Sequence, residues 1–285
     1  MPPSPKQLAH YTRLNVPPPT EPPQERIRSL MATRNEWKLY RRKCDYSKDE
    51  IISAYHKDSP FKVYKNEIWW GDSWDAQNFS QPYDFNTPFF EQFAALQLKV
   101  PREGTSVFNC TNCDYNSHIR ESKNCYLNSL VYKCEDLYYS YWMVNAVNVF
   151  DSMLANDSTL CYRCSDSNKI YECIMLEESD NCSNCYFSFQ LRGCKNCIFC
   201  ANLTNKDHYA HNKKVSKEEF EKIKNEALDS TNKSFDKALA QYKEIKSKTP
   251  HRFVHNINCE NCEGDHLYNC KNCDNCYESF ESEDC

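Results

Sequence analysis

The sequence has few glycines, no long apolar run and no excess of either charge, and each absence excludes a class of protein. Four glycines in 285 residues exclude a collagen-like or glycine-rich disordered chain. No stretch approaches the roughly 18 consecutive apolar residues of a membrane-spanning helix, so no membrane segment is expected. A net charge of −5 gives no general attraction to nucleic acid, although a local basic patch could still bind one.

Familiar catalytic motifs are also missing. The sequence contains no G-x-G-x-x-G, P-loop, G-x-S-x-G or H-E-x-x-H, which favours a non-enzymatic protein without excluding an enzyme.

Residues 1–19 lack the apolar run of a secretory signal, so we expect a cytoplasmic, reducing location. Cysteine is the residue in excess, with 19 copies, and in a reducing compartment paired cysteines hold metal more often than they form disulfides.

Composition divides the chain into five expected regions. These are a Pro-rich leader (1–35), an aromatic-rich α+β unit (36–107), a Cys-rich repeat region (108–203), a helical insertion (204–250) and resumed Cys-rich repeats (251–285). The last repeat position is Cys285 itself, so we expect the repeats to be truncated. Within the α+β unit, Pro88 begins an expected helix whose apolar face, including Phe89, Phe90 and Phe93, is interpreted as core. In the insertion, Ser216 and Glu219 form a capping box, and the periodicity fits one helix or a hairpin of two.

A basic segment covers residues 26–43. Its charges are Arg26, Arg28, Arg34, Lys38, Arg41, Arg42 and Lys43. Two interpretations stay open: a solvated surface helix, or a segment that binds RNA or another anion.

A repeat of about twelve residues runs through residues 110–200. Stepping by twelve from residue 113 gives Cys113, Cys125, Leu137, Val149, Cys161, Cys173, Cys185 and Cys197, with no charged residue among them. The following phase is mostly aromatic, with Tyr126, Tyr138, Phe150, Tyr162 and Tyr186. The preceding phase is rich in Asn, which suggests a ladder of side-chain amides along a stack. Such a short period predicts a mainly β protein, a stacked β-solenoid.

Two coil geometries compete. A coil of twelve residues would place cysteines in a thin core and the aromatic phase outside, where it would form a binding surface. A coil of two repeats, about twenty-four residues, would be wide enough to bury the aromatic phase inside. We favour the wider coil because it can bury the bulky side chains.

The cysteines are expected to be metal ligands. Two quartets of C-x2-C pairs carry the strongest signal: Cys182, Cys185, Cys194 and Cys197, and then Cys259, Cys262, Cys270 and Cys273. Weaker candidates are Cys110, Cys113, Cys125, Cys134, Cys161 and Cys164, and Cys276 and Cys285 lack obvious partners. Four thiolates at about 2.3 Å satisfy tetrahedral zinc, so two or more structural Zn²⁺ ions are expected. The alternatives are buried apolar cysteines, disulfides and iron–sulfur ligation.

Several stretches resemble a known family. "PPPTEPPQERIRSLMATRNEWKLYRRKCDYS", "EIWWGDSWD", "FNTPFFEQFAALQLKVPR" and "ANLTNKDHYAHNKKVSKEEFEK" are similar to large Cys-rich, zinc-ribbon proteins common in candidate-phyla bacteria. The resemblance covers nearly the whole chain and implies an intracellular, zinc-associated bacterial protein. It supplies no reaction. Members usually begin with a zinc ribbon whose second C-x2-C lies in the Pro-rich segment, and "TEPPQER" has no cysteine there, so that ribbon is missing or degenerate.

These observations lead to one expected function and two alternatives. The first is a zinc-stabilised, non-enzymatic scaffold that binds a protein partner. The second is a nucleic-acid-binding zinc protein that uses residues 26–43. The third is an iron–sulfur or thiol redox protein.

Overall fold

The computed structural model describes residues 12, 20–22, 25, 28, 35, 37–113 and 115–285. The protein is mainly β, and from residue 35 onward its described residues form two compact units, Asn35–Thr249 and Pro250–Cys285. Among the described residues, none of the helices has the length and apolar character needed to cross a membrane.

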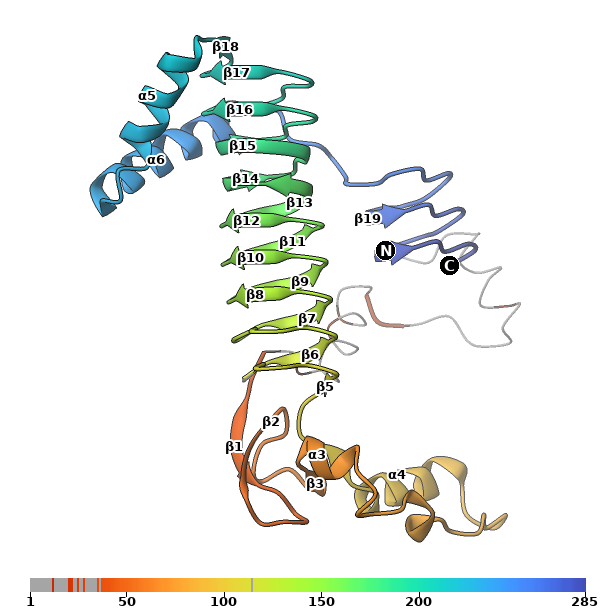
Figure 1. Cartoon of the computed structure of the whole chain (residues 1–285). Helices are drawn as coiled ribbons and strands as arrows, with labels where there is room; N and C mark the ends of the chain where they lie inside the picture. The colour runs from red at the N-terminus through yellow and green to blue at the C-terminus, as the bar shows by residue number, and fades with distance from the viewer. Residues whose placement is uncertain are drawn as a thin grey trace. The chain divides into compact units, whose positions relative to one another are not determined.

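The larger unit contains a 14-stranded sheet built from short strands. They are β5 (Val107–Phe108), β6 (Ser117–Arg120), β7 (Ser129–Tyr132), β8 (Glu135–Tyr138), β9 (Tyr141–Val144), β10 (Val147–Phe150), β11 (Met153–Asn156), β12 (Thr159–Tyr162), β13 (Ser165–Tyr171), β14 (Ile174–Glu177), β15 (Asp180–Phe189), β16 (Lys195–Ile198), β17 (Asp207–Ala210) and β18 (Lys213–Lys214). Figure 1 shows them lying one above another.

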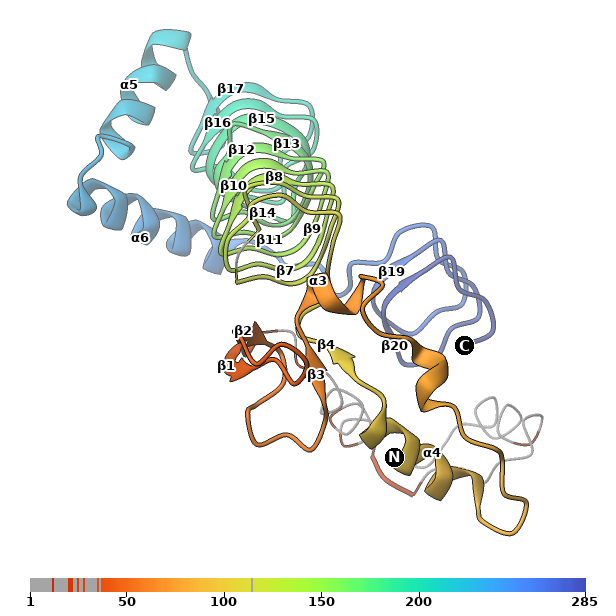
Figure 2. The same ribbon diagram turned by 60° about the horizontal axis from the view of Figure 1, so that its bottom comes forward.

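Paired strands from β5 to β17 are twelve residues apart in the sequence, whereas β18 pairs with β17 as an antiparallel hairpin. Val147 of β10 lies beside Glu135 of β8 on one side and Thr159 of β12 on the other, in parallel register. In a second row of strands, Ser129 of β7 lies beside Tyr141 of β9. The chain therefore rises by one level, here called a turn, every twelve residues, and Figure 2 views the turns close to the direction of stacking.

The twenty-four-residue coil favoured from the sequence is wrong for these strands. Its premise was that the aromatic phase must be buried inside. Instead Tyr126 and Phe150 point outward and are 37% and 40% exposed, while Cys125 and Val149, one residue earlier, are buried. A turn of twelve residues has room for one or two medium aliphatic side chains, such as Leu137 and Met143, beside small ones.

A three-residue rhythm lies beneath the twelve-residue turn. Every third residue from Asn109 to His211 has a left-handed backbone, with φ between 47° and 57°. The residue that follows points inward: every third residue from Asn116 to Cys200 is at most 5% exposed. Left-handed backbone costs an ordinary residue roughly 1–2 kcal/mol but is tolerated by Asn and Asp. This explains the Asn-rich phase, in which Asn112 donates to Asn124 and Asn124 to Asp136, each at 2.9 Å, so the amide ladder is confirmed.

A helical hairpin covers the last turns of the stack. Helices α5 (Lys217–Ala227) and α6 (Asn232–Lys248) are separate, which selects the hairpin from the two possibilities in the sequence. Half of the predicted capping box is present, because Ser216 Oγ accepts a hydrogen bond from the Glu219 N–H at 3.1 Å. The buried side chains of the hairpin, Phe220 and Tyr242 among them, pack on outward-facing apolar side chains of β15 and β16, including Tyr186 and Ile198.

Residues 37–106 precede the stack and form short strands and helices. The strands are β1 (Tyr40–Lys43), β2 (Glu50–Ser53), β3 (Val63–Tyr64) and β4 (Arg102–Glu103); the helices are α3 (Asn66–Trp69), the 3-10 turn η1 (Ala76–Phe79) and α4 (Phe89–Lys99). The expectation that α4 buries an aromatic face is wrong, since none of its residues is buried and Phe90 is 79% exposed.

The second unit, Pro250–Cys285, repeats the same architecture. Strands β19 (Gly264–Tyr268) and β20 (Cys276–Phe280) pair in parallel twelve residues apart. The preceding level is one residue shorter, because Ile257 bridges to Tyr268. Gly264 is required at its position: its φ is 142°, and a Cβ there would lie 1.8 Å from the carbonyl oxygen of Cys276.

Candidate metal-binding thiols

The turn geometry directs the cysteines inward. Each inward residue follows a left-handed residue, so its backbone N–H must find an acceptor within the stack. In many turns the side chain of a Ser, Asn or Cys twelve positions earlier is that acceptor. Ser122 Oγ accepts from the Cys134 N–H at 3.1 Å, and Cys134 Sγ accepts from the Ala146 N–H at 3.3 Å. The Cys134 thiol in turn donates to the Tyr132 carbonyl at 3.4 Å. Cysteine therefore has the same hydrogen-bonding role as serine in this fold.

Eight of these thiols, between residues 161 and 200, form one continuous chain of contacts in the turns nearest the helical hairpin. Cys161, Cys173, Cys185 and Cys197 occupy one column, in which each thiol is a near neighbour of the next. The other members are Cys164, Cys182, Cys194 and Cys200, and each contacts at least one thiol of the column or of its own set. Hydrogen bonds from the Cys164 and Cys173 thiols lower the pKa of Cys161, whereas burial raises the pKa of Cys164.

The first predicted quartet lies inside this chain. Cys182 contacts Cys185 and Cys194, and both of these have further thiol neighbours, including Cys197. The four sulfurs thus surround one region of the core. Within the described part of the chain, however, no three of them lie mutually within 4.8 Å. Neighbouring sulfurs around tetrahedral zinc are about 3.8 Å apart, so a metal in this quartet would require the thiols to move together.

The weaker set near the first turn is only partly assembled. Cys113 contacts Cys110 and Cys125, whereas burial raises the pKa of the Cys134 thiol to about 11 and no other thiol contributes to that shift. Cys110 and Cys113 are the more accessible pair and line an open cavity of about 900 Å³ together with Trp70 and Phe108.

The most compact thiol group is in the second unit. Cys273, Cys276 and Cys285 all lie within 4.8 Å of one another, with Cys285 Sγ 2.9 Å from Cys273 Sγ and 3.4 Å from Cys276 Sγ. The sequence interpretation missed two of these, although Cys285 follows Cys273 by one twelve-residue turn and Cys276 follows it by one three-residue step. These two spacings in the sequence could have predicted that the three thiols lie together.

This group fits a thiophilic metal. Three sulfurs already lie within 4.8 Å of one another, so they need only small shifts to reach the spacing of about 3.8 Å in a tetrahedral site. Cys262 and Cys270, from the second predicted quartet, are close enough to interact electrostatically with Cys273 and Cys285, so either is a candidate fourth ligand. The last predicted ligand, Cys259, donates to the Ile257 and Leu267 carbonyls, both at 3.3 Å. All nineteen cysteines have free thiols.

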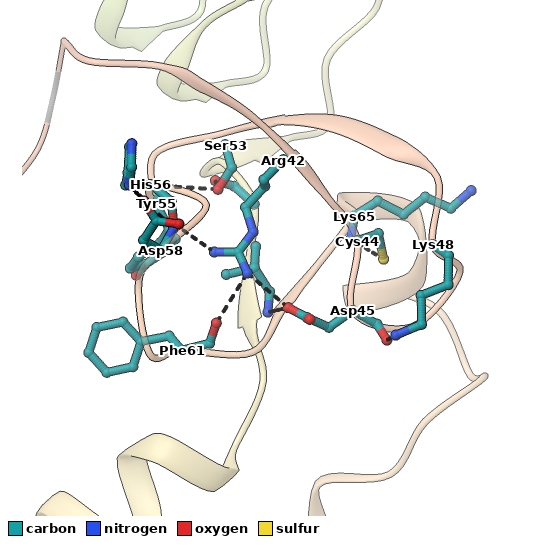
Figure 3. Close-up of polar contacts among 12 residues, drawn as sticks. Arg42, Cys44, Asp45, Lys48, Ser53, Tyr55, His56, Asp58, Phe61 and Lys65 are labelled. Atoms are coloured by element: carbon teal, nitrogen blue, oxygen red, sulfur yellow. Dashed lines mark hydrogen bonds and ion pairs between the residues drawn. The ribbon is translucent and has the colours of Figure 1, made fainter.

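The predicted basic segment lies partly outside the described residues, which do not include Arg26 and Arg34. Within them, Arg42 is committed to the fold (Figure 3). Its guanidinium donates to Asp45 at 3.0 Å and to the His56 and Phe61 carbonyls, and its side chain is 6% exposed. Arg42 is therefore not available to contact a nucleic-acid phosphate.

The remaining cysteine, Cys44, lies beside Arg42 (Figure 3). Its sulfur accepts backbone hydrogen bonds from Ser47 at 3.4 Å and Lys65 at 3.3 Å. Although burial opposes ionisation, these hydrogen bonds lower the pKa of the Cys44 thiol.

Comparison with known proteins adds no further identification. No protein-family model matches the chain, and no curated protein matches it.

Proposed function

We propose that this protein is a non-enzymatic scaffold: a β-solenoid with a twelve-residue coil, stabilised by zinc, that binds a protein partner on its outer aromatic row. The aromatic row is defined as Tyr126, Tyr138, Phe150, Tyr162, Ile174 and Tyr186, which stand twelve residues apart on successive turns. The observation that carries the proposal is that this row is covered at one end of the stack and exposed at the other.

The solenoid assignment rests on register and burial. Parallel partners twelve residues apart recur from β5 to β17, and inward side chains recur every third residue. A turn of twelve residues cannot bury a face alone, so each turn depends on its neighbours, as in other repeat proteins. An elongated repeat structure offers long, regular outer faces, which suit binding more than catalysis.

Zinc is assigned to the second unit. The proposed ligands are Cys273, Cys276 and Cys285, with Cys262 or Cys270 as the fourth. This unit has only a small buried cluster, centred on Leu267, Cys270 and Cys273, so a closed thiolate site would contribute directly to its folding. The proposal requires a reducing compartment, because the ligands must remain thiolates.

We infer the partner surface from the way in which the helical hairpin packs on the aromatic row. At the upper end, Tyr186 is 3% exposed and lies 6.4 Å from Phe220 of α5, between ring centroids. Tyr162, two turns below, is half-buried against Phe235 of α6, with centroids 6.1 Å apart. Below that point α5 and α6 no longer cover the row, and Phe150 stacks on Tyr138 with centroids 4.9 Å apart.

The exposed part of the row therefore offers a partner the same surface that α5 and α6 already occupy higher up. We assign to it an amphipathic helix of a partner protein, with aromatic side chains on its apolar face. The second outward row widens this surface, because Leu127 and Tyr139 are 39% and 52% exposed beside it.

Metal analysis tests the zinc assignment. Full-length protein purified without added zinc is expected to contain at least one zinc per chain, and Cys276→Ser should lose one equivalent. Cys134→Ser, which keeps the hydrogen-bonding role of an isolated thiol, is the matched control and should retain all of it. A visible charge-transfer absorption with bound iron would instead support the iron–sulfur alternative, and a metal-free protein would exclude both.

Site-specific photocrosslinking tests the partner surface. A photoreactive residue at position 150 should form one discrete adduct in extract of the source cell, and mass spectrometry should place the link on an amphipathic helix. The same residue at Met153, exposed on β11 in the other row of strands, is the control. An adduct with nucleic acid, equal labelling at both positions, or no adduct would overturn the assignment.

A further inference from the structure

A second group of metal-ligating side chains lies in the Pro250–Cys285 unit, and it contains no cysteine. His255 and His266 stand on neighbouring turns, and their rings stack with centroids 4.6 Å apart. Asp265 lies between their Nδ1 atoms: Oδ1 is 3.2 Å from His255 Nδ1, and Oδ2 is 3.3 Å from His266 Nδ1. One ligand atom from each of the three side chains lies within 4.8 Å of the other two.

The turn that is one residue short produces this arrangement. Ile257 bridges to Tyr268, so residues eleven apart become neighbours here, and His255 therefore stands beside His266. A strict twelve-residue step would have placed Val254 beside His266 instead. The local change of register is thus what pairs the two imidazoles.

The distances suit a divalent cation. Bonds of about 2.0–2.1 Å from a tetrahedral zinc ion to nitrogen and oxygen place neighbouring ligands about 3.3 Å apart. The two nitrogen–oxygen separations of 3.2 and 3.3 Å match this value. They also match weak hydrogen bonds, so the geometry leaves two arrangements to be distinguished: a histidine–aspartate–histidine hydrogen-bonded group and a metal site.

The carboxylate is held in place independently of any metal. Asp265 Oδ1 accepts hydrogen bonds from the backbone N–H of His255 at 2.6 Å and of His266 at 3.0 Å. These bonds fix the carboxylate plane while Oδ2 remains directed at the His266 ring. The side chains of His255, Asp265 and His266 are 24%, 34% and 24% exposed, so the group is sheltered but accessible to an ion. Such preorganisation by backbone donors is typical of metal sites.

We propose that His255, Asp265 and His266 bind a first-row divalent cation, foremost zinc, through two imidazole nitrogens and one carboxylate. This site is distinct from the thiolate site of Cys273, Cys276 and Cys285 in its donor chemistry. Three protein ligands leave a fourth position for water, whereas the thiolate site is closed. The two sites together give this unit two different kinds of metal centre.

Cobalt(II) is the probe that separates the two sites, because thiolate ligands give intense near-ultraviolet charge-transfer bands and imidazole–carboxylate ligands give only weak visible bands. The full chain carrying Cys276→Ser and Cys285→Ser removes the thiolate site. Cobalt titration of this variant should produce the weak visible bands and saturate at one equivalent. Adding His266→Gln should weaken cobalt binding at least tenfold.

His208→Gln is the matched control, because His208 Nδ1 lies 2.8 Å from Asp207 Oδ1 but has no second imidazole in its group. It should leave the titration unchanged. Nitrogen-15 spectra of the unsubstituted chain provide a readout that does not depend on a variant folding: zinc should shift the imidazole signals of both His255 and His266. Unchanged imidazole signals, or cobalt binding that His266→Gln does not weaken, would overturn the proposal. Failure of the thiolate assignment would appear separately, as missing charge-transfer bands in the unsubstituted protein.

Discussion

The sulfur of Cys134 accepts a hydrogen bond from the backbone N–H of Ala146, twelve residues further along the chain, at 3.3 Å. This contact links one turn to the next through a side chain rather than through the sheet. The same link is made by Ser152 to Cys164 at 3.0 Å and by Ser188 to Cys200 at 3.1 Å. The stack therefore needs a small inward acceptor at these positions, and this need alone accounts for many of its cysteines and serines.

Substitutions at Cys134 separate hydrogen bonding from metal binding. Serine keeps the donor and the acceptor, so Cys134→Ser should change the free energy of unfolding by less than about 1 kcal/mol. Alanine leaves the buried Ala146 N–H without an acceptor, so Cys134→Ala should lower it by about 1–3 kcal/mol. Urea denaturation of both variants measures the difference. Equal destabilisation by the two would indicate that sulfur itself, as a metal ligand, is what position 134 requires.

Replacing a residue that adopts the left-handed backbone at high cost is predicted to raise the stability of the protein. Leu160 has φ of 57° and a 47% exposed side chain, in the phase occupied by Asn148 one turn earlier. Leu160→Asn should therefore raise the free energy of unfolding by about 0.5–1 kcal/mol, since Asn adopts this backbone at lower cost. Thermal unfolding measures it, with Leu160→Ala as the control that removes the side chain without adding an amide. A loss of stability in Leu160→Asn would contradict the backbone assignment.

The hairpin should detach without unfolding the stack. Phe220 is 1% exposed, and replacing such a buried Phe by Ala typically costs about 3–5 kcal/mol. In Phe220→Ala, amides of α5 should exchange with solvent faster while those of β8 and β10 keep their protection. Phe253→Ala, at a side chain that is 98% exposed, should change neither. Simultaneous loss of protection in the hairpin and in β8 would show that the two are one cooperative unit.

Asp207 is predicted to make stability depend on acid. Asn196 donates to its carboxylate at 2.9 Å and His208 lies at 2.8 Å, and these contacts lower the pKa of Asp207 from 3.8. A lowered folded-state pKa means that the contribution is fully present above about pH 4 and is lost as pH falls through the folded-state value. The stability difference between the unsubstituted protein and Asp207→Asn should therefore shrink below about pH 4. A difference that stays constant from pH 7 to pH 3 would refute the assignment.

The twelve-residue period could be predicted from the sequence, but the width of the coil could not. Six cysteines in one phase revealed the period. The interpretation then assumed that Tyr126 and its equivalents needed an interior. In the structure Tyr186 is instead buried from outside, by the helical hairpin. The periodicity of the sequence predicted the hairpin but not where it packs.

The thiol groups were harder to predict because their ligand sets cross turns. Spacings of C-x2-C drew attention to Cys182 and Cys185, and the same spacing joins Cys273 to Cys276. Cys285, which completes the compact group, stands one turn away from Cys273. His255 and His266 meet only because one turn is a residue short, which no spacing rule indicates. The resemblance to Cys-rich zinc-ribbon proteins stays a prediction.

Sulfur positions provide the most direct test of the twelve-residue coil. An anomalous-scattering map from a crystal of the full chain should place the sulfurs of Cys161, Cys173, Cys185 and Cys197 in one straight column, with steps of about 4.8 Å. A column in which alternate members lie on opposite walls, or sulfurs distributed without a column, would contradict the account.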